Sequence, residues 1–204
     1  MFHLIHRLYT YRMWIIAGVS VVVLVAVAGG GYYYWQRYQA RTQAQAFYHA
    51  EQRYTDDQLT RTERLQQSEQ AFRQFLDDHP DATLAPSAWM YLAQIHWEQN
   101  EPEAARNAFE AVLKHPEATP ALRDVARIGL ATVAEAGGNL EQAASYIREV
   151  SDKPYEALKA YNLGRLAARQ DQMEEARQQF EKVARAQPSS ALNEWARQAL
   201  DYLP

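Results

Sequence analysis

The sequence predicts an all-α protein in which a single N-terminal transmembrane helix precedes a solenoid of stacked helix pairs. Two observations predict this fold. Residues 14–35 carry no charged side chain and are mostly apolar. Beyond residue 83, one pattern of apolar and small residues occurs three times, at intervals of 38 and 33 residues. A chain that combines these two features is expected to hold a helical-repeat domain at a membrane.

The recurring pattern is a Leu and a small residue, followed thirteen positions after the Leu by an Ala and four positions later by a large apolar residue. The three copies are Leu92-Ala93 with Ala105 and Phe109, Leu130-Ala131 with Ala143 and Ile147, and Leu163-Gly164 with Ala176 and Phe180. Periods near 34 residues are typical of tetratricopeptide (TPR) repeats, helix pairs that stack because one pair alone cannot bury its apolar face. We therefore predict a TPR-like solenoid of three repeats over residues 83–204.

Local signals place the helices inside each repeat. A proline is expected at the start of each first helix, where a missing backbone N–H costs nothing. The three are Pro86, Pro120 and Pro154. The predicted turns are 99–102, 137–139 and 170–172, each at the same offset from its Leu. The large residue of each copy is expected to fill the gap to the next unit. Leu192, Trp195, Leu200 and Leu203 predict a final helix over residues 191–203 that covers the last repeat as a cap.

The apolar segment has the length and composition of a membrane span. Its nine Ile, Val and Leu residues each contribute about −0.3 to −0.6 kcal/mol to insertion, about −3 to −5 kcal/mol together. A helix over residues 14–35 is about 33 Å long, enough for the bilayer core. Trp14 and the four aromatic residues 32–35 are expected at the two interfaces. A short tail, residues 1–13, precedes this span.

The apolar segment also fits a second interpretation, a cleaved secretory signal. A secretory signal has a basic region, an apolar region and a cleavage site of small residues, in that order. Here these would be Arg7 and Arg12, the apolar run, and Ala26-Val27-Ala28. Four aromatic residues directly after the cut favour a retained anchor instead. Residues 29–31, three glycines, indicate a kink, a face for close helix contact, or a flexible helix end. Positive charges are nearly balanced on the two sides, so charge alone hardly sets the orientation.

The residues between the span and the repeats predict two more helices. Residues 36–57 are good helix formers that continue the span, and Asp56-Asp57 and Thr60 interrupt them. A second helix is expected over residues 65–78, where Phe72 and Phe75 precede Pro80 as Phe180 and Val183 precede Pro188. The segment 36–82 is therefore predicted to be a juxtamembrane helix and a degenerate first repeat.

Composition argues against several functions. The net charge is −4 and the basic residues are scattered, so nucleic acid is not an expected partner. The chain has no Cys, and its six His residues lie in the membrane flank, at helix ends or singly within helices. No phosphate loop, nucleophile motif or metal-ligand spacing is present. We expect no enzymatic activity, no cofactor, no metal and no small-molecule substrate.

The inner face of the solenoid is the better candidate for a binding site, because first helices line the concave wall of a TPR array. The expected partner-binding residues are Met90, Gln94, Trp97, Glu135, Tyr161, Arg165 and Arg169, with Ile128 and Thr132 between them. Trp, Tyr and Arg are the residue types of binding hot spots. Trp97 alternatively packs on the preceding helix. Met90 and Ile128 stand where a chaperone-binding TPR domain needs Lys, which argues against recognition of a peptide's C-terminus.

The whole chain resembles the ancillary subunit of the bacterial Sec translocon, the YfgM type. The resemblance covers the short tail, the span ending in Tyr33-Tyr34-Trp35, the long helix through Arg41 and Tyr54, the runs 87–112 and 122–149, and the closing helix. It implies a single-pass inner-membrane protein with a cytoplasmic N-terminus and a periplasmic TPR-like domain. The implied partners are Sec translocon subunits and a membrane-anchored periplasmic chaperone, to which secreted proteins are handed over. The basic, aromatic tail departs from the acidic residues often found in relatives.

The same topology also suits an envelope assembly factor serving outer-membrane or cell-division machinery. Both alternatives are protein-binding scaffolds, and both are non-enzymatic. The absence of a lipid-attachment Cys disfavours an outer-membrane lipoprotein, whereas the retained span favours the translocon.

Overall fold

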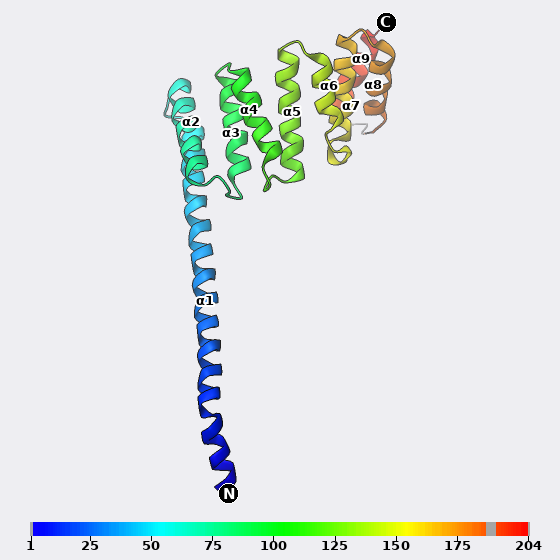
Figure 1. Ribbon diagram of the computed structural model, residues 1–204. Helices are drawn as coiled ribbons and strands as arrows, with labels where there is room; N and C mark the ends of the chain where they lie inside the picture. The colour runs from blue at the N-terminus through cyan, green and yellow to red at the C-terminus, as the bar shows by residue number, and fades with distance from the viewer. Residues whose placement is uncertain (1, 187–190, 204) are drawn as a thin grey trace. The chain divides into compact units, whose positions relative to one another are not determined.

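The computed structural model describes residues 2–186 and 191–203. Within these ranges every regular element is an α-helix, which confirms the predicted all-α class (Figure 1). The helices are α1 (Phe2–Thr55), α2 (Arg61–Asp78), α3 (Ala85–Glu98), α4 (Pro102–Lys114), α5 (Pro120–Ala136), α6 (Leu140–Arg148), α7 (Asp152–Arg169), α8 (Met173–Ala186) and α9 (Ala191–Tyr202). Pro188 and the side chains of Trp14 and Pro154 lie outside the described residues.

The chain divides into two compact units, residues 1–46 and residues 47–204. The first unit consists of α1 up to Ala46. The stretch Gly18–Thr55 of α1 is long and apolar enough to cross a membrane, and none of its most apolar part is buried. The helix continues through Gly29, Gly30 and Gly31 without a break. A glycine costs a helix about 1 kcal/mol without breaking its hydrogen bonds, which explains the unbroken helix.

The second unit is built from successive helix pairs. The pairs α3 with α4, α5 with α6, and α7 with α8 pack against each other, and each pair contacts the next helix along the chain. The first helices α3 and α5 also meet, and α7 meets the capping helix α9. The first helices therefore share one layer and the second helices the other, as a TPR-like array requires.

The second helix begins four residues earlier than predicted, at Arg61 rather than Leu65. Thr60 does not break the chain but caps α2: its side chain accepts a hydrogen bond from the Glu63 N–H, and the Glu63 carboxylate accepts one from the Thr60 N–H. This reciprocal capping box satisfies N–H groups that would otherwise lack partners. Thr60 is thus a start signal, not a stop signal.

The three turns within repeats are built in the same way. Asn100, Gly138 and Asp171 occupy equivalent places and have positive φ values of 62°, 80° and 58°. In each turn the N–H of the following residue reaches the carbonyl five positions back, at 2.8, 2.9 and 3.0 Å. This is the Schellman pattern of a helix C-terminus, which glycine, Asn and Asp tolerate best.

The expected prolines also start their helices. Pro86 and Pro120 lie in the first turns of α3 and α5. In α7 the backbone of Lys153 is extended (φ −111°, ψ 129°), so the regular helix begins at the following Pro154. A residue that precedes proline is pushed to this conformation by the proline ring.

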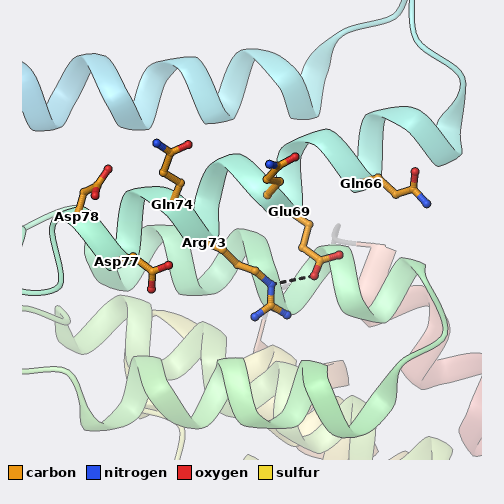
Figure 2. Close-up of a pocket in the computed structure, with 7 residues that line it drawn as sticks. Gln66, Glu69, Arg73, Gln74, Asp77 and Asp78 are labelled. Carbon is orange, nitrogen blue, oxygen red and sulfur yellow. Dashed lines mark hydrogen bonds and ion pairs between the residues drawn. The ribbon is translucent and has the colours of Figure 1, made fainter.

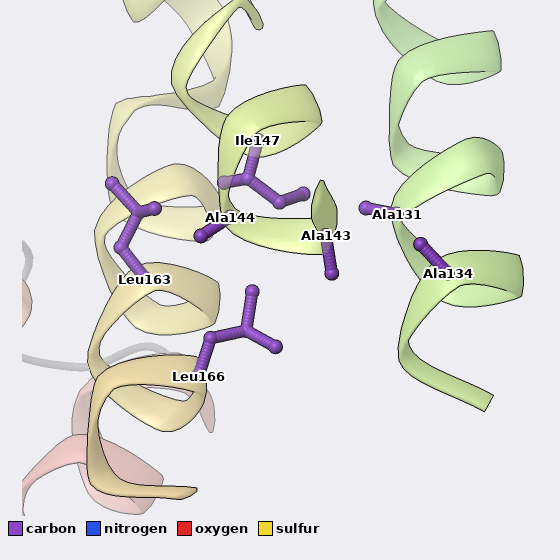
Figure 3. Close-up of a cluster of buried hydrophobic side chains, with 7 residues drawn as sticks. All are labelled: Ala131, Ala134, Ala143, Ala144, Ile147, Leu163 and Leu166. Carbon is purple, nitrogen blue, oxygen red and sulfur yellow. The ribbon is translucent and has the colours of Figure 1, made fainter. Parts of the chain in front are cut away.

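The small residues of the repeats allow close packing of their helices. One core cluster joins α5, α6 and α7 (Figure 3). Its members are Ala131, Ala134, Ala143, Ala144, Ile147, Leu163 and Leu166. A second cluster joins α7, α8 and α9 around Phe180, Val183 and Ala196. The predicted triplets are therefore core positions in the middle and last repeats.

The phenylalanine of the first clear repeat fills the gap to the next unit, as predicted. The Phe109 ring from α4 lies directly on Gly129 of α5, where an added Cβ atom would come within 2.3 Å of the ring. Phe180, at the equivalent place, lies on Gly164 of its own repeat, 3.0 Å from an added Cβ. Glycine is required at residue 129 because only a residue without a side chain admits the ring.

The end of α1 packs with α2 and α3 through aromatic rings. Phe47 lies 5.7 Å from Phe72 and 5.6 Å from Phe75 between ring centroids. Phe72 stacks on Tyr91 at 4.7 Å. Residues 47–55 therefore act as the packing partner of α2. Whether segment 36–82 evolved as a degenerate repeat stays a prediction.

Two hydrogen bonds set the register between α1 and α3. Tyr91 Oη donates to Glu51 Oε1 at 2.7 Å, and Tyr54 Oη donates to Glu98 Oε1 at 2.8 Å. Burial and these carboxylate partners raise the pKa of each tyrosine to about 12. Both phenols consequently remain protonated donors, and each helix supplies one donor and one acceptor to the other.

Candidate functional site

Three of the expected binding residues form one ionic cluster. Glu135 comes from α5, and Arg165 and Arg169 come from α7. Arg165 Nη2 donates to Glu135 Oε2 at 2.7 Å, and Nη1 atoms of both arginines donate to Oε1. Asn162 Oδ1 accepts a further hydrogen bond from Arg165 at 3.2 Å. The bidentate pairing fixes Arg165 between the first helices of two neighbouring repeats.

The charges of this cluster do not cancel, because it has one more positive group than negative groups. Hydrogen bonds from Arg165 hold the pKa of Glu135 below its ordinary value, and Glu135 raises the pKa of Arg165 in turn. One carboxylate faces two guanidinium groups, so a positive charge remains. Glu135 is shielded from water, whereas about half of the Arg169 side chain is exposed. Arg169 is therefore the member best placed to meet an acidic group of another molecule.

The fourth expected residue, Tyr161, lines a surface pocket one turn before Arg165. The pocket has a volume of about 490 Å³ and is lined by Tyr161, Trp195, Gln198, Ala199 and Tyr202. The Tyr161 ring lies 5.8 Å from Phe180 and 6.1 Å from Trp195. The pocket thus joins α7 to α9, with the core beneath it. We call Tyr161, Trp195 and Tyr202 the aromatic pocket.

The structure corrects the role expected of Trp195. Leu192, Leu200 and Leu203 pack against the last core cluster as predicted for a cap. Trp195 instead is 52% exposed and Tyr202 is 80% exposed. Their spacing of seven residues puts both on one side of α9, beside the apolar face. This spacing was the signal that sequence analysis missed.

Met90, Gln94 and Trp97 lie on α3 and are not joined to the ionic cluster by any hydrogen bond, ion pair or ring contact among the described residues. Met90 and Trp97 are half-buried, and Gln94 is exposed with its amide 3.4 Å from Glu98 Oε1. Ile128 packs against the central core cluster, and Thr132 bonds the Ile128 carbonyl at 3.0 Å. The binding role of Trp97 stays a prediction.

A second groove, of about 550 Å³, follows one polar face of α2 (Figure 2). Arg73 Nε donates to Glu69 Oε1 at 2.9 Å within it. The same guanidinium reaches the buried His96, whose Nε2 must accept because arginine only donates. His96 Nδ1 then donates to Glu101 at 2.8 Å. Both nitrogens of this histidine are occupied by protein groups, which gives it a structural role.

The groove offers no metal site, since the described residues contain no group of three or more His, Asp and Glu side chains able to share an ion. Its lining residues come from a single helix. A catalytic constellation normally combines groups from several elements. The aromatic pocket with its neighbouring arginines is consequently the stronger candidate for a binding site.

The Glu135 cluster gives a prediction for stability. Replacing Glu135 with Gln should lower the unfolding free energy at pH 7 by about 1 kcal/mol, because Arg165 loses its ionic partner. Because the pKa of Glu135 is lowered in the folded protein, its ionised carboxylate stabilises the fold at pH values above 4.5, the ordinary pKa of a glutamate. This stabilisation is lost as the pH falls through the lowered pKa of the folded state. The difference in thermal midpoint between wild type and Glu135→Gln, measured at pH 7, 5 and 4, should therefore be largest at pH 7.

The control is Glu141→Gln, which removes an exposed carboxylate 3.4 Å from Arg148. Its midpoint should stay close to wild type at every pH. A gap between wild type and Glu135→Gln that is constant from pH 7 to pH 4 would contradict the assigned cause.

Comparison with known proteins agrees with this architecture. The sequence profile of the tetratricopeptide repeat-like domain family matches residues 8–204, which is nearly the whole chain. A comparison with curated proteins gave no match.

Proposed function

Because the chain belongs to the tetratricopeptide repeat-like domain family, we propose that it is a membrane-anchored scaffold that binds other proteins. Domains of this kind present a continuous face of stacked helices to their partners. The apolar stretch of α1 supplies the anchor, and residues 47–204 supply the binding domain. No enzymatic activity is part of this proposal.

The observation that carries the proposal is the aromatic pocket. Trp195 and Tyr202 expose large apolar surfaces to water, which a soluble surface normally limits. Tyr161 and Arg165 lie one helical turn apart, so the pocket adjoins the positive ionic cluster. Aromatic residues beside arginine dominate the binding energy of protein interfaces. The pocket is suited to an apolar or aromatic side chain, and Arg169 to a neighbouring acidic one.

We propose further that the partners are Sec translocon subunits and a membrane-anchored periplasmic chaperone. On this view the protein is a single-pass inner-membrane protein whose N-terminus is cytoplasmic and whose repeat domain is periplasmic. The resemblance of the chain to the ancillary translocon subunit supports this assignment. The scaffold would keep the chaperone beside the channel from which secreted proteins emerge.

The test is site-specific photo-crosslinking in native membranes. A photoreactive amino acid placed at Tyr202 should crosslink to translocon subunits or to the chaperone, as identified by mass spectrometry. Crosslinks to outer-membrane assembly or cell-division machinery would instead support the alternative scaffold. Crosslinks to no protein, with the domain folded, would overturn the assignment of the pocket.

The affinity of the identified partner should then depend on the pocket. Trp195→Ala should weaken binding by about 30-fold, the effect of losing a hot spot worth about 2 kcal/mol. Tyr48→Ala is the matched control because it removes an exposed ring from α1. Equal dissociation constants for the two variants would contradict the proposed site.

A further inference from the structure

The segment of α1 directly after the apolar run has an unusual charge. All 25 acidic residues of the chain lie at or after Glu51. Arg37 and Arg41 therefore have no carboxylate within nine residues along the sequence. In the described part of the chain they also have no ion-pair partner, in contrast to Arg61, Arg127 and Arg165 of the repeat unit. Their positive charges are uncompensated by the protein.

The same segment is organised around aromatic rings. A small hollow of about 110 Å³ is lined by Tyr33, Tyr34, Arg37, Tyr38 and Arg41. The Arg37 guanidinium lies over the Tyr33 ring, 4.9 Å from its centroid. This contact orients the planar group while its N–H donors stay available at the edge. The tyrosine rings are exposed, as expected for residues that contact something other than protein.

Helix geometry brings both arginines to the level of lipid headgroups. Arg37 lies about 9 Å and Arg41 about 15 Å beyond Gly31 along the helix axis. The headgroup layer on each side of a bilayer is about 5–8 Å thick. Side chains in an α-helix lean toward its N-terminus, here toward the apolar span. Arg37 therefore lies at the level of the lipid phosphates. Arg41 lies one helical turn further from the apolar span, and its side chain extends toward the same phosphates.

From this geometry we propose that Arg37 and Arg41, with Tyr33, Tyr34 and Tyr38, form a binding site for the phosphate of an anionic phospholipid. Guanidinium groups bind phosphate oxygens in a forked geometry, and the tyrosine rings lie against the glycerol and upper acyl region. The proposal rests on the proposed membrane anchor. It adds that the protein selects its surrounding lipids by charge.

The experiment uses the full-length chain. Flotation with phosphatidylcholine vesicles first tests the anchor. The detergent-solubilised protein is then titrated with phosphatidylglycerol and with phosphatidylcholine, and bound lipids are counted by native mass spectrometry. Wild type should bind phosphatidylglycerol more tightly than phosphatidylcholine. In the double variant Arg37→Gln/Arg41→Gln the ratio of the two affinities should fall about 25-fold, about fivefold for each arginine. Arg148→Gln/Arg197→Gln, which removes two exposed charges from the repeat unit, should behave as wild type.

Each other outcome has a separate meaning. A wild-type chain that does not float overturns both the anchor and the lipid site. A chain that floats but binds both lipids equally, or whose preference survives in Arg37→Gln/Arg41→Gln, overturns the lipid site alone. Displacement of the lipid by millimolar inorganic phosphate would show a site for the free anion and would likewise overturn the assignment to a phospholipid.

Discussion

Replacing Phe72 with Ala is expected to lower the unfolding free energy of the repeat unit by about 3–5 kcal/mol. Phe72 is fully buried where the end of α1, α2 and α3 meet, stacked on Tyr91 and packed edge-on against Phe47. Alanine would leave a cavity that three helices cannot all close. The measurement is the urea concentration at which half of the full-length protein is unfolded in mild detergent, with unfolding monitored by circular dichroism.

The control for Phe72 is Tyr34→Ala, which removes an aromatic ring that is 75% exposed. Its urea midpoint should match wild type. Phe72→Leu should fall between the two, because leucine fills part of the cavity. If Phe72→Ala unfolded at the same urea concentration as Tyr34→Ala, the packing of α1 on the repeats would be wrong.

Replacing Gly129 with Leu is expected to cost about 3 kcal/mol, the upper end of the usual penalty for overpacking. Even the first side-chain atom would enter the Phe109 ring, which is itself buried. Accommodation would require α4 and α5 to move apart, so the loss should be shared by two neighbouring repeats. The thermal midpoint of the full-length protein measures the effect.

The matched control introduces the same side chain three residues later on α5, by Thr132→Leu. Thr132 is exposed, so this leucine meets no ring. The double variant Gly129→Leu/Phe109→Ala should be more stable than the sum of the single losses predicts, since the smaller residue makes room. Strict additivity of the two losses would argue against direct contact between Phe109 and Gly129.

The turns and helix starts of the repeats could be predicted because their causes are local. Gly138 tolerates positive φ, and Pro120 fits a first helical turn, whatever surrounds them. Thr60 shows the limit of such signals. The sequence predicts an interruption at Thr60, whereas α1 has already ended at Thr55 and the reciprocal bond with Glu63 makes Thr60 the start of α2.

The candidate site was less predictable because it depends on how helices are aligned in space. Glu135 and the two arginines were expected on one face, but their pairing depends on the register between α5 and α7. Trp195 was expected among the apolar residues with which the final helix covers the last repeat, but its side chain is 52% exposed. Which of these residues binds a partner remains a prediction.

The turns at Asn100, Gly138 and Asp171 have a consequence for the evolution of this array. Each is closed by hydrogen bonds between residues no more than five positions apart. A helix pair therefore carries its own fold-back, and its turn does not depend on contacts with another unit when a pair is duplicated or deleted. The distance over which such a protein reaches its partners can change stepwise, by whole units, while the membrane-proximal and terminal segments stay the same.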